Sequence, residues 1–364
     1  GWYIAEGSMR KPASTYVNGN VHLILADNSS LTAIGNSTDA GINITEGNSL
    51  TIYAQSNGSE IGSLSCQGGQ YGPGIGAAYE KNCGTIIING GMITANGGYR
   101  GAGIGGGYNK YGPWDAGKGG NVTINNGIVH AMGREGGAGI GGGYGGDGGE
   151  VTINGGTITA ESRGSGAGIG GGIYGEGGKV TINNGTVIAF GEAIGRGAGI
   201  GGGGDNGGGT VTLNGGIVIA TGGGWGGAGI GSGESFDGGN VIIKNESVTV
   251  IATGGEGAAD IGNGKGGTRQ FNIKRGDLAG TDLTYVKLQV QNLPKDSVEK
   301  IYFNGQEHEI NSAAITGFFV DKSAQTKNIS LDPAGPLINI NPGDVQNSRI
   351  TIDARPYGAL VTGF

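Results

Sequence analysis

The chain has 364 residues, of which 89 are glycine and only 14% are charged. Glycine does not occupy every third position and proline is scarce, which excludes collagen, while the fixed spacing of Val, Ile and Thr excludes a disordered glycine-rich chain. The net charge of −7 argues against nucleic acid as a partner, because phosphate binding needs clustered Lys and Arg. No apolar run reaches the roughly 20 residues of a membrane helix, so we expect no membrane insertion.

The first 19 residues precede the regular part of the chain, and we predict that residues 1–19 form an N-terminal cap. A cap is expected there because an exposed sheet edge invites aggregation. After residue 20 the sequence holds short segments rich in Val, Ile, Leu and Thr, separated by Gly, Asn and Ser. These segments predict the strands of about two coils of a repeating β structure, at 21–25, 31–33, 41–44, 50–54 and 63–65.

The two cysteines of the chain, Cys66 and Cys83, lie 17 positions apart and flank the segment 67–82. A disulfide between them would close this segment as a loop, and disulfides form in oxidising, extracellular compartments. We therefore predict a Cys66–Cys83 disulfide, with two buried free thiols as the alternative.

The middle of the chain repeats about every 30 residues. A segment that reads Val-Thr-Ile/Leu-Asn starts at positions 122, 151, 180 and 211, with spacings of 29, 29 and 31 residues. A second signature, Gly-Ala-Gly-Ile-Gly, starts at Gly101, Gly137, Gly166, Gly197 and Gly227. Each unit reads as strand, Asn-Gly turn, strand, loop, short strand and loop, with no helical period. One unit cannot bury its apolar face alone, so the units must stack.

The alternation of side chains places the aliphatic residues of each unit on one side of the strands. Stacking then produces three apolar rows that face a common axis. The predicted fold is an all-β parallel β-helix with three short strands per coil and about eight coils over residues 20–267. The asparagine before each turn is expected to hydrogen-bond from coil to coil, since Asn tolerates the sharp turn and stacked amides pair. This row is Asn89, Asn125, Asn154, Asn183 and Asn214.

The character of the chain changes at about residue 268. Glycine becomes sparse, and five of the eight prolines follow this point. Strand-like runs continue at 285–290, 300–303, 337–340 and 349–353. We predict that residues 268–364 form a C-terminal β-rich cap or a small β domain.

A family resemblance rests on three features: Val-His-Leu-Ile-Leu-Ala-Asp at 21–27, Gly-Asn-Ser-Leu-Thr-Ile-Tyr at 47–53, and the Gly-Ala-Gly-Ile-Gly-Gly-Gly repeats. Together they resemble the β-helical repeats of large surface proteins of Gram-positive gut bacteria, over roughly residues 20–267. The resemblance implies a right-handed parallel β-helix, secreted or on the bacterial cell surface, with a carbohydrate-binding or adhesin role. Right-handed β-helices also include polysaccharide lyases and glycosidases, so the resemblance leaves an enzyme open.

The outward positions of the Gly-Ala-Gly-Ile-Gly signature are glycines, and we predict that they form a groove floor without side chains. A backbone requirement for glycine is the other explanation. The loops on both sides of this floor carry aromatic rings, guanidiniums and carboxylates, which suit sugars; solvated loop tips are the alternative. The candidate glycan-binding residues are Arg100, Arg134, Glu135, Arg163, Arg196 and Trp225 before the floor, and Tyr108, Trp114, Tyr144, Asp147, Tyr174 and Glu176 after it.

Signals for catalysis or metal binding are weak. The histidines His22, His130 and His308 are scattered, which does not suggest a zinc site or a His-based triad. Residues 142–150 partly match a calcium-binding repeat. We expect no cofactor, and we leave calcium open because of this partial match.

Polar residues are spread over several coils, which favours binding over catalysis, because catalysis needs a single site. We therefore expect an extracellular, monomeric module that binds polysaccharides or glycoprotein glycans; a glycoside hydrolase, a polysaccharide lyase and a structural stalk are the alternatives.

Overall fold

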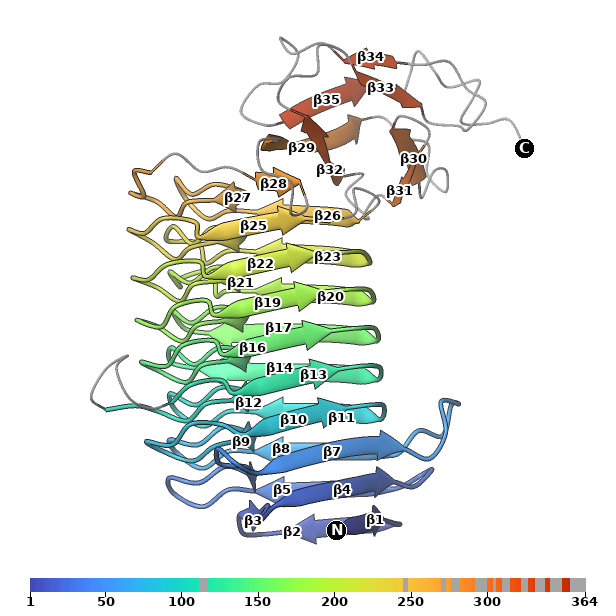
Figure 1. Ribbon diagram of the computed structural model, residues 1–364, viewed down its shortest axis with the longest axis vertical. Helices are drawn as coiled ribbons and strands as arrows, with labels where there is room; N and C mark the ends of the chain where they lie inside the picture. Colours follow the sequence, from blue (N-terminus) through green and yellow to red (C-terminus); the bar gives the residue numbers. More distant parts are fainter. Residues whose placement is uncertain are drawn as a thin grey trace.

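The computed structural model describes residues 1–110, 117–244 and 248–269, and beyond them the residues of strands β28 to β35. Every regular element among these residues is a β-strand. Strands β1 to β28 form three parallel sheets that wind around one axis as stacked coils (Figure 1). This arrangement confirms the predicted parallel β-helix with three strands per coil. None of the described residues forms a helix long and apolar enough to cross a membrane.

Each coil contributes one strand to each sheet. The first sheet contains β1 (Trp2–Ala5), β4 (Asn20–Leu25), β7 (Ser49–Ala54), β10 (Thr85–Ile88), β13 (Asn121–Ile124), β16 (Glu150–Ile153), β19 (Lys179–Ile182), β22 (Thr210–Leu213), β25 (Asn240–Ile243) and β28 (Ile273–Arg275). The second contains β2 (Ser8–Lys11), β5 (Ser30–Ile34), β8 (Ser63–Gln67), β11 (Met92–Asn96), β14 (Ile128–Arg134), β17 (Thr157–Arg163), β20 (Thr186–Phe190), β23 (Ile217–Thr221) and β26 (Thr249–Thr253). The third contains β3 (Thr15–Tyr16), β6 (Ile42–Asn43), β9 (Ile75–Gly76), β12 (Ile104–Gly105), β15 (Ile140–Gly141), β18 (Ile169–Gly170), β21 (Ile200–Gly201), β24 (Ile230–Gly231) and β27 (Ile261–Gly262).

The core is the column of aliphatic side chains inside the three sheets. Strand partners keep the repeat in register, so that Ile124 lies beside Ile153 and Ile140 beside Ile169. The four isoleucines are fully buried. Because alternate residues of a strand point to opposite faces, the Val-Thr-Ile pattern delivers two core residues and one outward threonine per coil. The predicted apolar rows are therefore confirmed.

The asparagine row predicted at the first corner is present. The side-chain amide of Asn125 donates to Asn89, and that of Asn154 donates to Asn125, each at 2.7 Å between nitrogen and oxygen. Asn183 and Asn214 continue the row in the same direction. The amides thus pair along the axis, outside the backbone ladders of the first and second sheets.

The two ends of the solenoid differ. The stretch predicted as an N-terminal cap, residues 1–19, itself forms a three-stranded coil, which pairs in parallel with the next coil through β1, β2 and β3. At the other end β28 pairs in parallel with β25, but the following strand pairs with β28 in the antiparallel sense. The later strands are β29 (Asp282–Gln291), β30 (Lys300–Phe303), β31 (Gln306–Glu309), β32 (Ile315–Asp321), β33 (Lys327–Ser330), β34 (Ile338–Ile340) and β35 (Arg349–Asp353).

One contact joins this C-terminal region to the free edge of the second sheet. Tyr285 on β29 is buried, and its hydroxyl accepts a hydrogen bond from the amide of Ala252 and donates one to the carbonyl of Val250. These two backbone groups belong to β26, the last strand of the second sheet. Tyr285 therefore supplies two of the hydrogen bonds that a further strand would have made.

The predicted disulfide is wrong: Cys66 and Cys83 are both free and buried. Cys66 lies in the second sheet, where it continues the core-facing row of Ala33 and Ala95. Cys83 precedes β10 of the first sheet, and the strand β9 lies between the two cysteines in the chain. The segment 67–82 is thus part of a regular coil, held by its own backbone pairing, and not a loop that needs a covalent closure.

Candidate functional site

The glycine positions predicted to form a groove floor are buried, which corrects that expectation. A side chain at Gly103 would place its Cβ 2.4 Å from the backbone nitrogen of Met132, and one at Gly137 would lie 2.2 Å from the carbonyl oxygen of Gly101. Backbone of the neighbouring coils therefore covers these positions completely. Glycine is needed there because the backbone of one coil packs directly against the backbone of the next. The loops therefore form the surface on this side of the solenoid.

The loops before and after the third sheet meet and form an aromatic surface. We call it the tyrosine cluster, and it lies on the side of the solenoid where the longer loops project, to the left in Figure 1. Neighbouring ring centroids are 5.3 to 6.4 Å apart, which is the range of favourable aromatic pairs. Its members come from four successive coils and are Tyr71, Tyr79, Tyr99, Tyr108, Tyr144 and Tyr174.

The rings of the tyrosine cluster present both edges and faces. Tyr108 and Tyr144 meet at 87°, and Tyr144 and Tyr174 meet at 76°, so both pairs are T-shaped, with the edge of one ring against the face of the other. Tyr99 and Tyr174 are each more than 40% exposed, whereas Tyr144 is half-buried. Burial raises the pKa of the Tyr144 hydroxyl, which therefore remains a neutral hydrogen-bond donor. The cluster combines apolar ring surface with hydroxyl groups.

Arg100 lies in the middle of the tyrosine cluster. The central carbon of its guanidinium is 4.5 Å from the ring centroid of Tyr144, 4.8 Å from that of Tyr108 and 5.2 Å from that of Tyr99. These distances are typical of cation–π contacts. Four of the predicted site residues, Arg100, Tyr108, Tyr144 and Tyr174, are thus brought together on one surface.

A second cluster lies farther along the axis and is charged. Arg196 pairs with Asp205 at 3.6 Å and with Glu234 at 3.2 Å, and its guanidinium lies 5.9 Å from the ring of Trp225. We call these four residues the Arg196 cluster. Arg196 and Trp225 are predicted site residues, but their partners here are carboxylates, and Trp225 stands half exposed beside them. The two clusters therefore have different chemistry on the same side of the solenoid.

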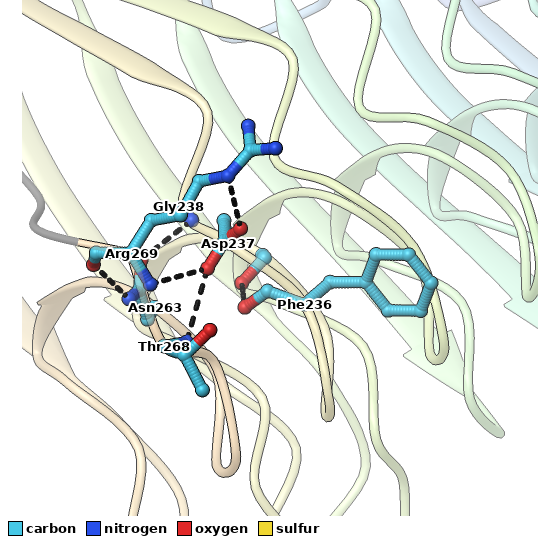
Figure 2. Close-up of polar contacts among 7 residues, drawn as sticks. Phe236, Asp237, Gly238, Asn263, Thr268 and Arg269 are labelled. Atoms are coloured by element: carbon cyan, nitrogen blue, oxygen red, sulfur yellow. Dashed lines mark hydrogen bonds and ion pairs between the residues drawn. The ribbon is translucent and has the colours of Figure 1, made fainter.

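Acidic residues that precede the first-sheet strands hydrogen-bond to the backbone of the next loop. The carboxylate of Asp147 accepts a hydrogen bond from the backbone amide of Glu176, one coil later, at 3.0 Å. Asp237 occupies the same repeat position in the last coils, where one carboxylate oxygen accepts the amides of Thr268 and Arg269 (Figure 2). Its other oxygen pairs with the Arg269 side chain at 3.2 Å. These carboxylates tie one loop to the next.

The remaining predicted site residues do not join either cluster. Arg134 ends β14 and Glu135 follows it, and both are exposed, while Arg163 pairs with Glu161 at 2.9 Å. Trp114 lies outside the described residues. Among the described residues no three His, Cys, Asp or Glu side chains come close enough together to hold a metal ion.

Two residues of the tyrosine cluster were missed as site candidates: Tyr71 and Tyr79. Residues 73–76 read Pro-Gly-Ile-Gly, a partial copy of the signature, and this copy identifies both tyrosines because Ile75 pairs with Ile104. Counting from these partners places Tyr79 at the repeat position of Tyr108 and Tyr71 at that of Arg100. The loops of this coil therefore belong to the same surface as the loops of the coils that follow it.

The fold and the repeat define a parallel β-helix repeat protein. In agreement, a family model described as a beta helix repeat matches residues 86–108, 122–144, 151–173 and 180–204. Each matched segment runs from a first-sheet strand to the loop after the third-sheet strand. Searches of the curated proteins and of the solved structures found no match to the chain.

Proposed function

We propose that this protein is a glycan-binding module that holds an extended saccharide across the tyrosine cluster. The observation that carries the proposal is the continuous run of six tyrosine rings over four coils. The apolar faces of sugar rings pack on aromatic side chains, and the hydroxyls at the sugar edge find hydrogen-bond partners in tyrosine hydroxyls and in Arg100. Coils about 4.8 Å apart present these groups repeatedly, as a polymer of sugars requires.

The proposal extends to the setting of the protein. The resemblance of residues 20–267 to repeats of surface proteins of Gram-positive gut bacteria supports a secreted or cell-surface adhesin. The two buried thiols are compatible with that setting, because burial and not oxidation protects them. In this setting the solenoid displays the tyrosine cluster on a rigid scaffold, and binding needs little reordering.

The test is to measure retention on a panel of plant, mucin and microbial polysaccharides, with the wild type beside Tyr108→Ala and Tyr144→Ala. Loss of one stacking ring is worth about 1 kcal/mol, so each variant should bind roughly fivefold more weakly. Tyr3→Ala is the control, because Tyr3 is also a tyrosine and is exposed, but it lies on β1 in the terminal coil. Equal binding by all four proteins, or no retention on any polysaccharide, would contradict the proposal and leave the structural stalk as the better account.

A glycoside hydrolase is the second candidate, and the Arg196 cluster is the observation that favours it. Asp205 and Glu234 come from different loops and meet at one guanidinium, and glycosidases use two carboxylates. Incubation with the same panel, followed by measurement of new reducing ends and of ultraviolet absorbance for lyase products, tests it. Release that Glu234→Gln abolishes would identify an enzyme. Repeating the incubation with a chelator tests any need for calcium.

A further inference from the structure

Arg100 and Arg196 occupy the same position of the repeat, directly before the Gly-Ala-Gly-Ile-Gly signature. The carbonyl of Arg100 accepts the amide of Tyr144, and the carbonyl of Arg196 accepts the amide of Glu234, one coil farther along in each case. Both side chains therefore start from equivalent positions of the repeat, although only Arg100 has a positive φ.

The partners of the two guanidiniums are opposite in kind. Arg196 is neutralised by two carboxylates, Asp205 and Glu234. At Arg100 tyrosine rings take the place of these carboxylates, and no carboxylate of the described residues forms an ion pair with it. A ring face attracts a cation, but it does not use the hydrogen-bond donors of the guanidinium as a carboxylate does. Arg100 thus has a side-chain hydrogen bond to Tyr108 but no carboxylate partner among the described residues. Because a guanidinium has five N–H donors, others remain for a ligand.

The backbone of Arg100 supports a role for its side chain beyond packing. Its φ of 72° lies in the left-handed region, which is strained for an L-amino acid other than glycine and lowers stability. Two other coils have glycine at this repeat position, Gly136 and Gly226, both with positive φ. Glycine therefore fits the fold at position 100 at least as well as arginine, and the fold does not explain why arginine is there.

We propose that the tyrosine cluster selects glycans that carry an anionic group, which Arg100 binds while the tyrosine rings hold the sugar body. This rests on the proposed glycan-binding function and names its ligand class. Guanidinium binds carboxylate and sulfate groups through paired hydrogen bonds, and both occur on sugars. The net charge of −7 disfavours a dense polyanion, so the class is a sugar with isolated acidic groups.

The experiment compares acidic sugars with their neutral counterparts by titration calorimetry: sialyllactose against lactose, a galacturonate trimer against its methyl ester, and lactose that carries one sulfate. The wild type should bind the acidic member of a pair about tenfold more tightly, as one charge-assisted contact provides. The sialyl and galacturonate pairs report a carboxylate ligand, and the sulfated lactose reports a sulfate.

The decisive variant is Arg100→Gly, which the backbone at this position accommodates. It should remain folded, still bind the neutral sugars through the tyrosine rings, and lose the tenfold preference. Lys179→Gln is the control for net charge, because Lys179 pairs with Glu150 on the first sheet away from the loops, and it should keep the preference. Equal binding of acidic and neutral sugars by the wild type, or a preference that survives Arg100→Gly, would overturn the inference and leave the glycan-binding proposal standing. Absence of binding to every sugar, acidic or neutral, would overturn both.

Discussion

Gly141 lies where the chain leaves the third sheet, and its φ of +133° is one that L side chains rarely adopt. A Cβ added there would lie 2.0 Å from the carbonyl oxygen of Gly170 in the next coil. We expect Gly141→Ala to lower the free energy of unfolding by about 2 kcal/mol or more, because backbone strain and a clash with backbone add.

Chemical denaturation followed by circular dichroism measures this loss. The matched control is Gly207→Ala, since Gly207 has no positive φ and the nearest atom to its added Cβ is 3.9 Å away. An equal and small effect of both substitutions would show that the corner glycine is not required.

The two thiols allow a second test at the residue scale. Burial raises the pKa of the Cys66 thiol far above its usual range and that of Cys83 to about 12. Neither should react with a thiol reagent at about pH 8 in the folded protein, and both should react after unfolding without reductant. Finding no reactive thiol in the unfolded, unreduced protein would instead support a disulfide between Cys66 and Cys83.

The same thiols couple stability to pH. The folded state holds their protons to a higher pH than the unfolded state, whose thiols ionise near the ordinary value of 9.0. This contribution to stability is therefore complete below that value and is lost as the pH rises toward about 12. Replacement of Cys66 by alanine, which matches the row of Ala33 and Ala95, should reduce this alkaline loss.

At the scale of the elements, Asp237 ties the loop after β24 to the segment that follows β27, the last strand of the third sheet. Its carboxylate holds the amides of Thr268 and Arg269, and the Gly238 amide donates to Asn263 beside it (Figure 2). Asp237→Ala should leave both amides without their acceptor and raise their hydrogen exchange, with a cost of about 1–2 kcal/mol confined to this end. Asp237→Asn keeps one acceptor oxygen and should protect them. Unchanged exchange in the alanine variant would contradict the role.

The elements also show how far the sequence predicts this protein. The alternation in Val151 to Ile153 and the turn after Asn154 are local signals, so strands, core rows and asparagine ladder follow from them. The path of the loops does not, because glycine allows many backbone conformations. Parity alone placed Gly103 on the outside, whereas the next coil covers it. The tyrosine cluster was predicted in part, since only the three-dimensional convergence of the loops joins Arg100 to Tyr144.

For the whole molecule, contacts between neighbouring coils should determine stability. Deletion of residues 151–179, one complete repeat of 29 residues, joins Glu150 to Val180 and keeps every later side chain facing its original side. The shortened protein should retain a β-type circular dichroism spectrum and cooperative unfolding at a lower temperature. Deletion of 151–165 removes about half a coil and should abolish cooperative unfolding. Equal behaviour of the two deletions would contradict a solenoid held together coil by coil.

The direction of the backbone hydrogen bonds has a mechanical consequence. In all three sheets they connect one coil to the next along the axis, so tension between the two ends pulls each bond lengthwise. The interfaces between coils lie in series and carry the same force, and the weakest yields first. A coil of 29 residues contributes about 4.8 Å of stacked height but extends to about 95 Å once peeled away. Under tension the solenoid should lengthen one coil at a time, and each coil that unfolds should dissipate mechanical energy before the next one yields.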